Sequence, residues 1–514
     1  MSRFNWLSVC FVAIAFSGSA YAQEENRPLS AIDWFNQHYS EEDTSTQPEE
    51  FTGVPAQKQL PSVEVTILGE PTPDSVGLLS PAVSGLPSGL WKNSETSDLV
   101  AHLDAIATPR VPALNALLAR MMLAEAEGPV GEPGEFLLAR GKMLTRLGTI
   151  EPAISLIERA GPDTTQALFR QWAELKLLDG SENELCNMLI AAPSLLPDYE
   201  FRIFCLSRSG DWSAAATMLL GAETLEQMDA DLVLLLTRFL DPELFEDAPL
   251  VTVPEQDTSP LQFRLYEAVG EPLPTTHLPL AFAHWDLKGL SGWKAQLTAG
   301  ERLAVTGAVS ENRLMGIYSA NLPSASGGVF SRVATIQELD DAVAQADPQL
   351  IGDILPEAWE LFEEVGLRSV LANLFADDLM QIQFRDPQIA KLAHELGLLS
   401  RSYQFVAWNH EATEPRIAFL NAVASGQADR TEFEGILPDA IRNGFKGDIS
   451  EKSLAMISEG RTGEALLHAI SMITEGQDAP PSAITEAIAL FTALGLSDTA
   501  RQYSLQLLLD RDPL

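Results

Sequence analysis

Basic residues are scarce in this sequence. Of the 514 residues, 33 are Lys or Arg and 72 are Asp or Glu, so the formal net charge at pH 7 is −39. Binding to phosphate backbones or anionic lipids depends on Lys and Arg, and an excess of carboxylates repels both. The composition therefore excludes nucleic acid as a partner and argues against an anionic membrane surface.

Long apolar runs are also missing after the N-terminus. No later segment has 18 uninterrupted apolar residues, and a membrane-spanning helix needs about 20, so we expect no membrane span in the mature chain. Residues 1–22 have Arg3, a short apolar run over 7–16, and small residues at Ala20 and Ala22. This is the pattern of a secretory signal peptide cleaved after Ala22. It predicts a periplasmic protein, with secretion as the alternative.

Cysteine is rare, and two of the three cysteines lie beyond the signal segment. Cys10 falls within it, which leaves Cys186 and Cys205. An even number of cysteines in an oxidising compartment indicates a disulfide. The two lie in consecutive helical patterns, 181–191 and 198–209, which an antiparallel hairpin would bring together. We therefore predict a Cys186–Cys205 disulfide, and two buried free thiols are the alternative.

The common catalytic motifs are absent. The sequence has no Gly-x-Ser-x-Gly elbow, phosphate-binding Walker loop, Gly-x-Gly-x-x-Gly, Cys-x-x-Cys or His-Glu-x-x-His. The seven His are dispersed, and Pro279 separates His277 from His284. We therefore predict no catalytic residue, no cofactor and no metal site.

Two short patterns nonetheless resemble parts of penicillin-recognising serine enzymes. Ser291 and Lys294 form a Ser-x-x-Lys pattern, and Ser310 and Asn312 form Ser-x-Asn, but the third element, Lys-Thr-Gly, is missing. A different enzyme, acting on the cell wall through a carboxylate acid or base, stays open because carboxylates are abundant. Glutamates also crowd around Trp359, at Glu357, Glu360, Glu363 and Glu364. An acidic solute- or cation-binding envelope protein is therefore a further alternative.

Helical periodicity dominates from about residue 96 onward. Leu168, Trp172 and Leu175 follow the i, i+4, i+7 spacing of one helix face, and similar patterns recur to the C-terminus. Residues 23–95 differ, because they are acidic and rich in Pro and Gly, with a short helical patch at 29–39 and one alternating, strand-like stretch at 63–68. The sequence therefore predicts an all-α fold preceded by an extended segment.

Glycines recur at the spacing of helical hairpins. Two groups of three are separated by 32 and 30 residues and by 34 and 35 residues. Glycine readily adopts the left-handed conformation that ends a helix, and a hairpin that cannot bury its apolar face alone stacks on its neighbours. These predicted repeat-turn glycines are Gly148, Gly180, Gly210, Gly426, Gly460 and Gly495.

Three of these turns carry a family resemblance. Residues 210–216, 460–465 and 495–500 resemble the turn and second-helix start of tetratricopeptide repeats, in two blocks at roughly 134–222 and 385–512. The family's Trp, Leu-Gly, Tyr and closing Pro positions are mostly unfilled. The resemblance implies a helical-hairpin solenoid that binds a protein or peptide along a concave face.

The predicted organisation has five parts. They are a signal peptide (1–22), an acidic and Pro/Gly-rich extended segment with one short strand (23–95), a helical-repeat block (96–222), a less regular helical region (223–384) and a C-terminal helical-repeat block (385–514). We expect a non-enzymatic periplasmic protein that binds another envelope protein or peptide as a scaffold or adaptor.

Overall fold

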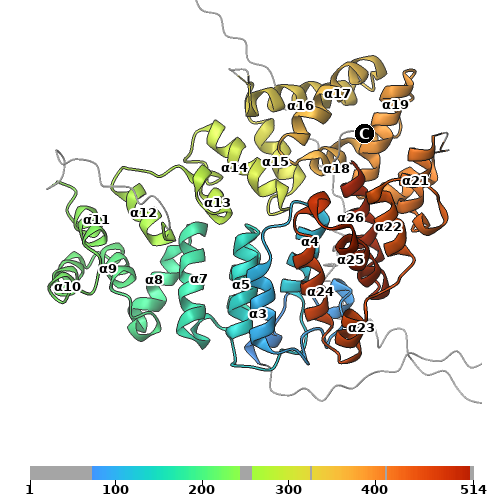
Figure 1. The fold of residues 1–514 in the computed structure, drawn as a ribbon. Helices are drawn as coiled ribbons and strands as arrows, with labels where there is room; N and C mark the ends of the chain where they lie inside the picture. Colours follow the sequence, from blue (N-terminus) through green and yellow to red (C-terminus); the bar gives the residue numbers. More distant parts are fainter. Residues whose placement is uncertain (1–71, 244–257, 324–326, 411, 413, 510–514) are drawn as a thin grey trace, which may run out of the picture. The chain divides into compact units, whose positions relative to one another are not determined.

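A computed structural model describes residues 72–243, 258–323, 327–410, 412 and 414–509 (Figure 1). The predicted signal peptide, its cleavage site, the helical patch at 29–39 and the strand at 63–68 lie outside these residues. Within them, all regular elements are helices, and β pairing is limited to two single-residue bridges, Leu79–Ala124 and Glu95–Val130. The predicted all-α class is confirmed for this part of the chain.

The first series of helices is built from consecutive neighbours. Each helix from α5 to α12 packs on the next one, and α5 also contacts α7, as α9 contacts α11. The helices are α5 (Glu135–Arg146), α6 (Ile150–Ala160), α7 (Gln166–Asp179), α8 (Glu182–Ala191), α9 (Tyr199–Arg208), α10 (Trp212–Thr224), α11 (Ala230–Leu240) and α12 (Pro260–Ala268), with short 3-10 helices η2 (Pro162–Thr164) and η3 (Pro193–Leu195) between them.

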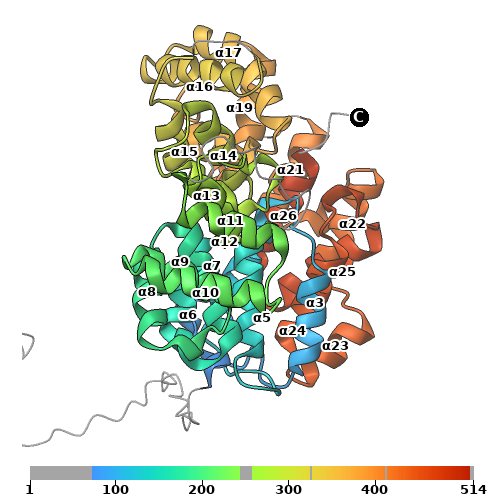
Figure 2. The same cartoon turned by 90° about the vertical axis from the view of Figure 1, so that its left-hand side faces the viewer.

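The middle helices turn away from this series and follow one another from α13 to α17, rising up the view in Figure 2. Thr306 anchors them to the first series by donating a hydrogen bond to the Leu147 carbonyl at 2.7 Å. The elements are η5 (Thr275–His277), η6 (Leu280–Phe282), α13 (Ala283–Asp286), α14 (Trp293–Val305), α15 (Glu311–Tyr318), α16 (Val329–Ala344) and α17 (Pro348–Glu363).

The C-terminal helices form a second series, in which α22 packs closely on α25. Gly444 permits this approach, because a Cβ at that position would lie 2.6 Å from Ile488 Cβ. The elements are α18 (Arg368–Leu379), α19 (Pro387–Leu399), α20 (Tyr403–Trp408), α21 (Pro415–Ala424), η7 (Ala428–Arg430), α22 (Ile436–Phe445), α23 (Glu451–Ser458), α24 (Thr462–Met472), η8 (Gly476–Asp478), α25 (Pro481–Ala493) and α26 (Ser497–Leu509).

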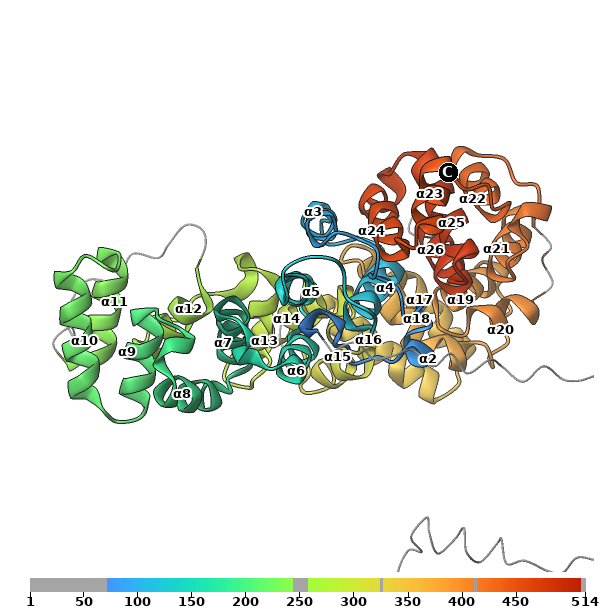
Figure 3. The ribbon, with the colours of Figure 1, turned by 90° about the horizontal axis from the view of Figure 1, so that it is seen from below.

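The first described residues join the two series. They contain η1 (Pro73–Ser75), α2 (Pro81–Ser84), α3 (Thr96–Ala105) and α4 (Pro112–Leu123). Helices α3 and α4 contact α5 on one side, while α3 contacts α24 and α4 contacts α26 on the other (Figures 1 and 3). No local sequence pattern predicts this arrangement, because it joins residues separated by more than 300 positions.

Specific contacts fix residues 72–95 in this position. Trp91 is fully buried against Gly463, where a Cβ would lie 2.4 Å from the indole ring, and the Gly463 N–H donates to the Leu90 carbonyl at 2.9 Å. Arg140 is also fully buried, and its guanidinium donates to the carbonyls of Met122, Val76 and Ala124. Buried polar groups of this kind are stable only when they are hydrogen-bonded. The segment is therefore part of the core.

Candidate functional site

The predicted disulfide is confirmed. Cys186 on α8 and Cys205 on α9 are bonded, with their Cα atoms 4.9 Å apart, and both residues are buried. The bond joins α8 to α9, and these two helices correspond to the predicted helical segments 181–191 and 198–209. A buried disulfide between two packed helices has a structural role.

The six repeat-turn glycines all have positive φ, between 70° and 88°. Each follows the last turn of a helix, so their left-handed conformation serves the chain reversal. Gly148 shows the close packing at such a turn, because a Cβ there would lie 2.9 Å from Leu303 Cδ2. The buried His284 ring donates from Nε2 to the Gly148 carbonyl at 2.5 Å. These glycines position helices and contribute no reactive group.

The serine-enzyme patterns are part of the helical framework. The Ser291 hydroxyl donates to Asp286 Oδ1 at 2.8 Å, and Ser310 caps α15 by accepting from the Arg313 N–H at 3.3 Å. N-capping satisfies a backbone donor that the first helical turn leaves free. The contacts of both hydroxyls are therefore those of turn and cap residues.

One of the glutamates near Trp359 forms an ion pair with an arginine. Glu363 forms an ion pair with Arg368, and the Arg368 guanidinium lies 4.1 Å from the centroid of the Trp359 ring. Elsewhere, burial raises the pKa of Glu174 on α7 and of Glu200 on α9. Neither of these two carboxyls lines the cavity or the groove described next.

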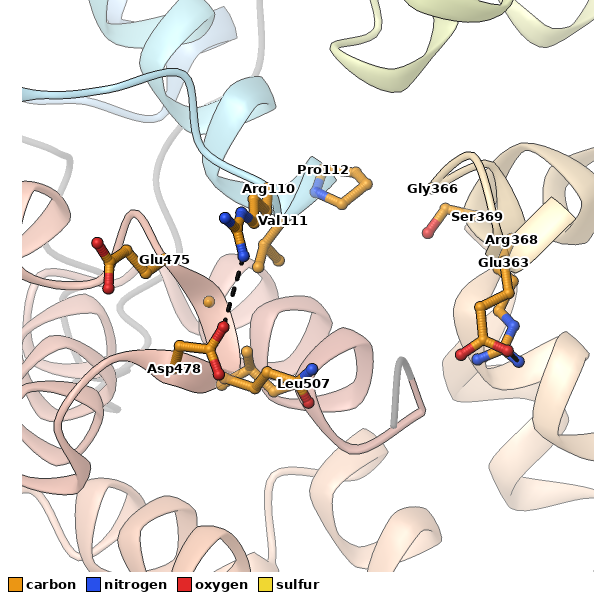
Figure 4. A pocket seen from close by; sticks show the side chains of 12 residues that line it. Arg110, Val111, Pro112, Glu363, Gly366, Arg368, Ser369, Glu475, Asp478 and Leu507 are labelled. Atoms are coloured by element: carbon orange, nitrogen blue, oxygen red, sulfur yellow. Dashed lines mark hydrogen bonds and ion pairs between the residues drawn. The ribbon is translucent and has the colours of Figure 1, made fainter. Parts of the chain in front are cut away.

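A small cavity of about 180 Å³ lies where three distant segments meet (Figure 4). Arg110, just before α4, forms an ion pair with Asp478 of η8 at 3.4 Å, and Glu475 lies beside them. The Glu363–Arg368 pair lies on the opposite side. Both arginines are already paired with carboxylates. We therefore interpret this junction cavity as part of the packing between segments and not as a binding site.

A much larger hollow lies on the second series. It has a volume of about 1000 Å³ and is formed by the end of α18, the non-helical link 380–386, α19, α20 and residues 409–410. We call it the α18–α20 groove. The apolar residues that line it include Met380, Ile382, Phe384, Ala393, Phe405 and Val406.

Two histidines stack at one end of the α18–α20 groove. The ring centroids of His394 and His410 are 3.9 Å apart. His394 Nε2 is 2.9 Å from Asn421 Oδ1, and the Asn421 amide donates to the His410 carbonyl at 3.2 Å. Burial and the neighbouring His410 lower the pKa of His394 to about 4. The His394 ring is therefore neutral at pH 7, which allows it to stack against a second imidazole.

Large aromatic side chains stand exposed on the short helix beside this groove. Phe405 is 57% exposed and Trp408 is 72% exposed. Their i, i+3 spacing places them on one side of α20. Exposed apolar surface that continues into a groove is typical of a site that another molecule covers.

Sequence reasoning did not find this site. Tyr403, Phe405, Val406 and Trp408 lie close together in the chain, but only Tyr403 and Val406 are buried. A six-residue helix is too short for its apolar periodicity to separate a core face from an exposed face.

Comparison of the chain with models of known families, with characterised proteins and with solved structures gives no significant match. Among the described residues, no three metal-ligating side chains converge. No helix in the same part of the chain is both long enough and apolar enough to cross a bilayer.

Proposed function

We propose that this chain is an exported, non-enzymatic helical-repeat protein of the periplasm that binds another envelope protein or peptide as a scaffold or adaptor. The signal-like N-terminus supports the location. The packing of successive helices and the left-handed glycines at their turns support an array of tetratricopeptide-like hairpins. The observation that carries the binding role is the α18–α20 groove with its exposed aromatic side chains.

The groove suits a macromolecular partner better than the junction cavity does. Its volume accommodates several side chains of a partner, whereas the junction cavity measures about 180 Å³ and its arginines are already paired. Covering Phe405 and Trp408 would remove apolar surface from water, which favours association by roughly 25 cal/mol per Å² before the costs of ordering are subtracted. Buried aromatic anchors of this kind dominate the energetics of many interfaces.

Crosslinking in intact cells tests this function. The tagged protein is crosslinked and purified, and proteins bound to it are identified by mass spectrometry. We expect one stoichiometric envelope protein with the wild type and its loss with Phe405→Ser. Leu220→Ser is the matched control, because Leu220 is an exposed apolar residue (64%) on α10. Retention of the same protein by Phe405→Ser, or efficient digestion of peptidoglycan by the purified protein, would contradict the proposal.

A further inference from the structure

The charges at the α18–α20 groove have one sign. Among the described residues that line it, Asp377 is the one carboxylate, and none is Lys or Arg. Asp378 follows it, and burial together with Asp341 and Asp378 raises the pKa of Asp340, so these carboxylates lie within electrostatic range of one another. The exposed basic residue of the link is Arg385. Lys391 and Arg401 lie on the neighbouring elements, and each already forms an ion pair with a glutamate. The carboxylates named here therefore outnumber Arg385.

The link 380–386 forms one wall of the groove, and this wall packs on the core through apolar side chains. Along the link, Met380, Ile382 and Phe384 are half-buried and pack on the core, while Gln381 and Gln383 between them are exposed. The link therefore presents amides outward and anchors itself through alternate apolar side chains. These contacts hold the link in place, so this wall of the groove is already formed before a partner binds.

We infer that the α18–α20 groove binds an apolar segment that carries Lys or Arg, contributed by another protein. This inference rests on the proposed function and names the chemistry of its partner. Apolar side chains of the segment would cover Phe405 and the half-buried wall, while its cations would lie near Asp377 and Asp378. Charge complementarity of this kind steers association and sets specificity.

The same charges argue against two other occupants. A second copy of this chain carries the same net charge of −39, so its approach is repelled. An anionic lipid surface is repelled for the same reason. Both occupants are outcomes that the experiment below distinguishes.

Two synthetic peptides of equal length test the inference by fluorescence anisotropy with the full exported chain. Both have Leu and Phe at helical spacing on one face; the other face carries Lys in one peptide and Glu in the second. We expect the Lys peptide to bind at least about tenfold more tightly at low salt, and added salt to reduce the difference. Phe405→Ser should weaken its binding about tenfold, while Leu220→Ser should leave it unchanged.

The carboxylates are tested separately. Asp377→Asn combined with Asp378→Asn should bring the two peptides to within about twofold of each other, because the amides keep the shape and remove the charge. Equal binding of the two peptides to the wild type would overturn the inference. If Phe405→Ser nevertheless abolished the cellular crosslink, the proposed function would stand without this partner chemistry.

Three further results would overturn the inference. The first is Lys-peptide binding that neither Phe405→Ser nor the aspartate variant weakens, which would place the site elsewhere. The second is binding to phosphatidylglycerol vesicles that Phe405→Ser abolishes, which would assign the groove to anionic lipid. The third is a dimer in sedimentation analysis that Phe405→Ser dissociates, which would assign the groove to a second copy.

Discussion

The hairpins α8–α9 and α19–α20 both consist of two packed helices, but different interactions hold the two helices together. In the first, ten-residue helices are joined by the buried Cys186–Cys205 disulfide. In the second, a thirteen-residue helix meets a helix of six residues through side-chain contacts, and a groove stays open beside them. The comparison shows that one hairpin is fixed by a covalent bond, whereas the other lines an open groove.

The close approach of α19 to α20 depends on the absence of a side chain. A Cβ at Gly397 would lie 3.0 Å from both methyl carbons of Val406. Helix α20 can therefore pack directly on the backbone of α19, while its residues Phe405 and Trp408 stay exposed. Where α8 meets α9, the Cys186–Cys205 disulfide joins the two packed helices.

Removing the disulfide should have the largest effect on stability. The bond closes a loop with a sequence separation of 19, which stabilises the folded state by about 3 kcal/mol in the chain-entropy model. We expect Cys186→Ser with Cys205→Ser to reduce the protection of α8 and α9 amides in hydrogen exchange, while α19 and α20 keep theirs. Reduction of the wild type should reproduce this pattern. Unchanged protection in both hairpins would contradict a structural role for the disulfide.

Acidification should lower the free energy of unfolding through His394 in the α19–α20 hairpin. The folded-state pKa of His394, about 4, is below its ordinary value of 6.5, so the unfolded state binds more protons between these pH values. The stability that the neutral His394 ring contributes is therefore fully present above about pH 6.5. As the pH falls from 7 to 5, this group lowers the free energy of unfolding by about 2 kcal/mol.

The pH effect is measured by comparing the unfolding free energy of the wild type with that of His394→Gln at both pH values. The variant should lose less stability on acidification, because it lacks this titrating group. Parallel pH profiles for the two proteins would show that His394 does not make the expected contribution.

A smaller effect is expected from Gly397→Ala. Contact with Val406 should cost more than the gain in helix propensity, leaving a net loss of about 1 kcal/mol. The protection of α20 amides in hydrogen exchange should decrease first. Gly221→Ala on α10 is the matched control, since a Cβ there has no neighbour within 4 Å, and it should be neutral or stabilising. The same response from both variants would argue against a tight α19–α20 contact.

The smallest change in stability is expected from Trp408→Ala. The side chain is 72% exposed, so its removal should alter the unfolding free energy by no more than about 0.5 kcal/mol. Binding of the Lys peptide should nevertheless weaken, whereas Ile190→Ala on α8, also at an exposed position, should leave both properties unchanged. A large loss of stability in Trp408→Ala would show that the indole belongs to the core.

Local sequence patterns were sufficient for the helices and for the disulfide. Leu168, Trp172 and Leu175, whose spacing predicted the helix, are all buried on α7. Cys186 and Cys205 lie in adjacent helices whose pairing needs only a hairpin. These features depend on contacts between near neighbours in the chain. The same holds for the glycine turns, because the backbone conformation after a helix is a local property.

The site required information that the sequence does not hold locally. Phe405 and Tyr403 are both aromatic, yet Tyr403 is buried while Phe405 is exposed. That difference depends on what packs above α20, which is a tertiary property. For the same reason, the sequence did not show that Trp91 inserts beside Gly463, 372 positions further along the chain.

Site-specific photocrosslinking in intact cells tests the central claim most directly. A photoreactive residue is placed at Gln383, which is exposed in the α18–α20 groove, or at Asn187, which is exposed on α8 of the disulfide-bonded hairpin. We expect one envelope protein to crosslink from Gln383, through an apolar segment that carries Lys or Arg, and no product from Asn187. The same products from both positions, or a product from Asn187 alone, would contradict the assignment of the groove as the binding site.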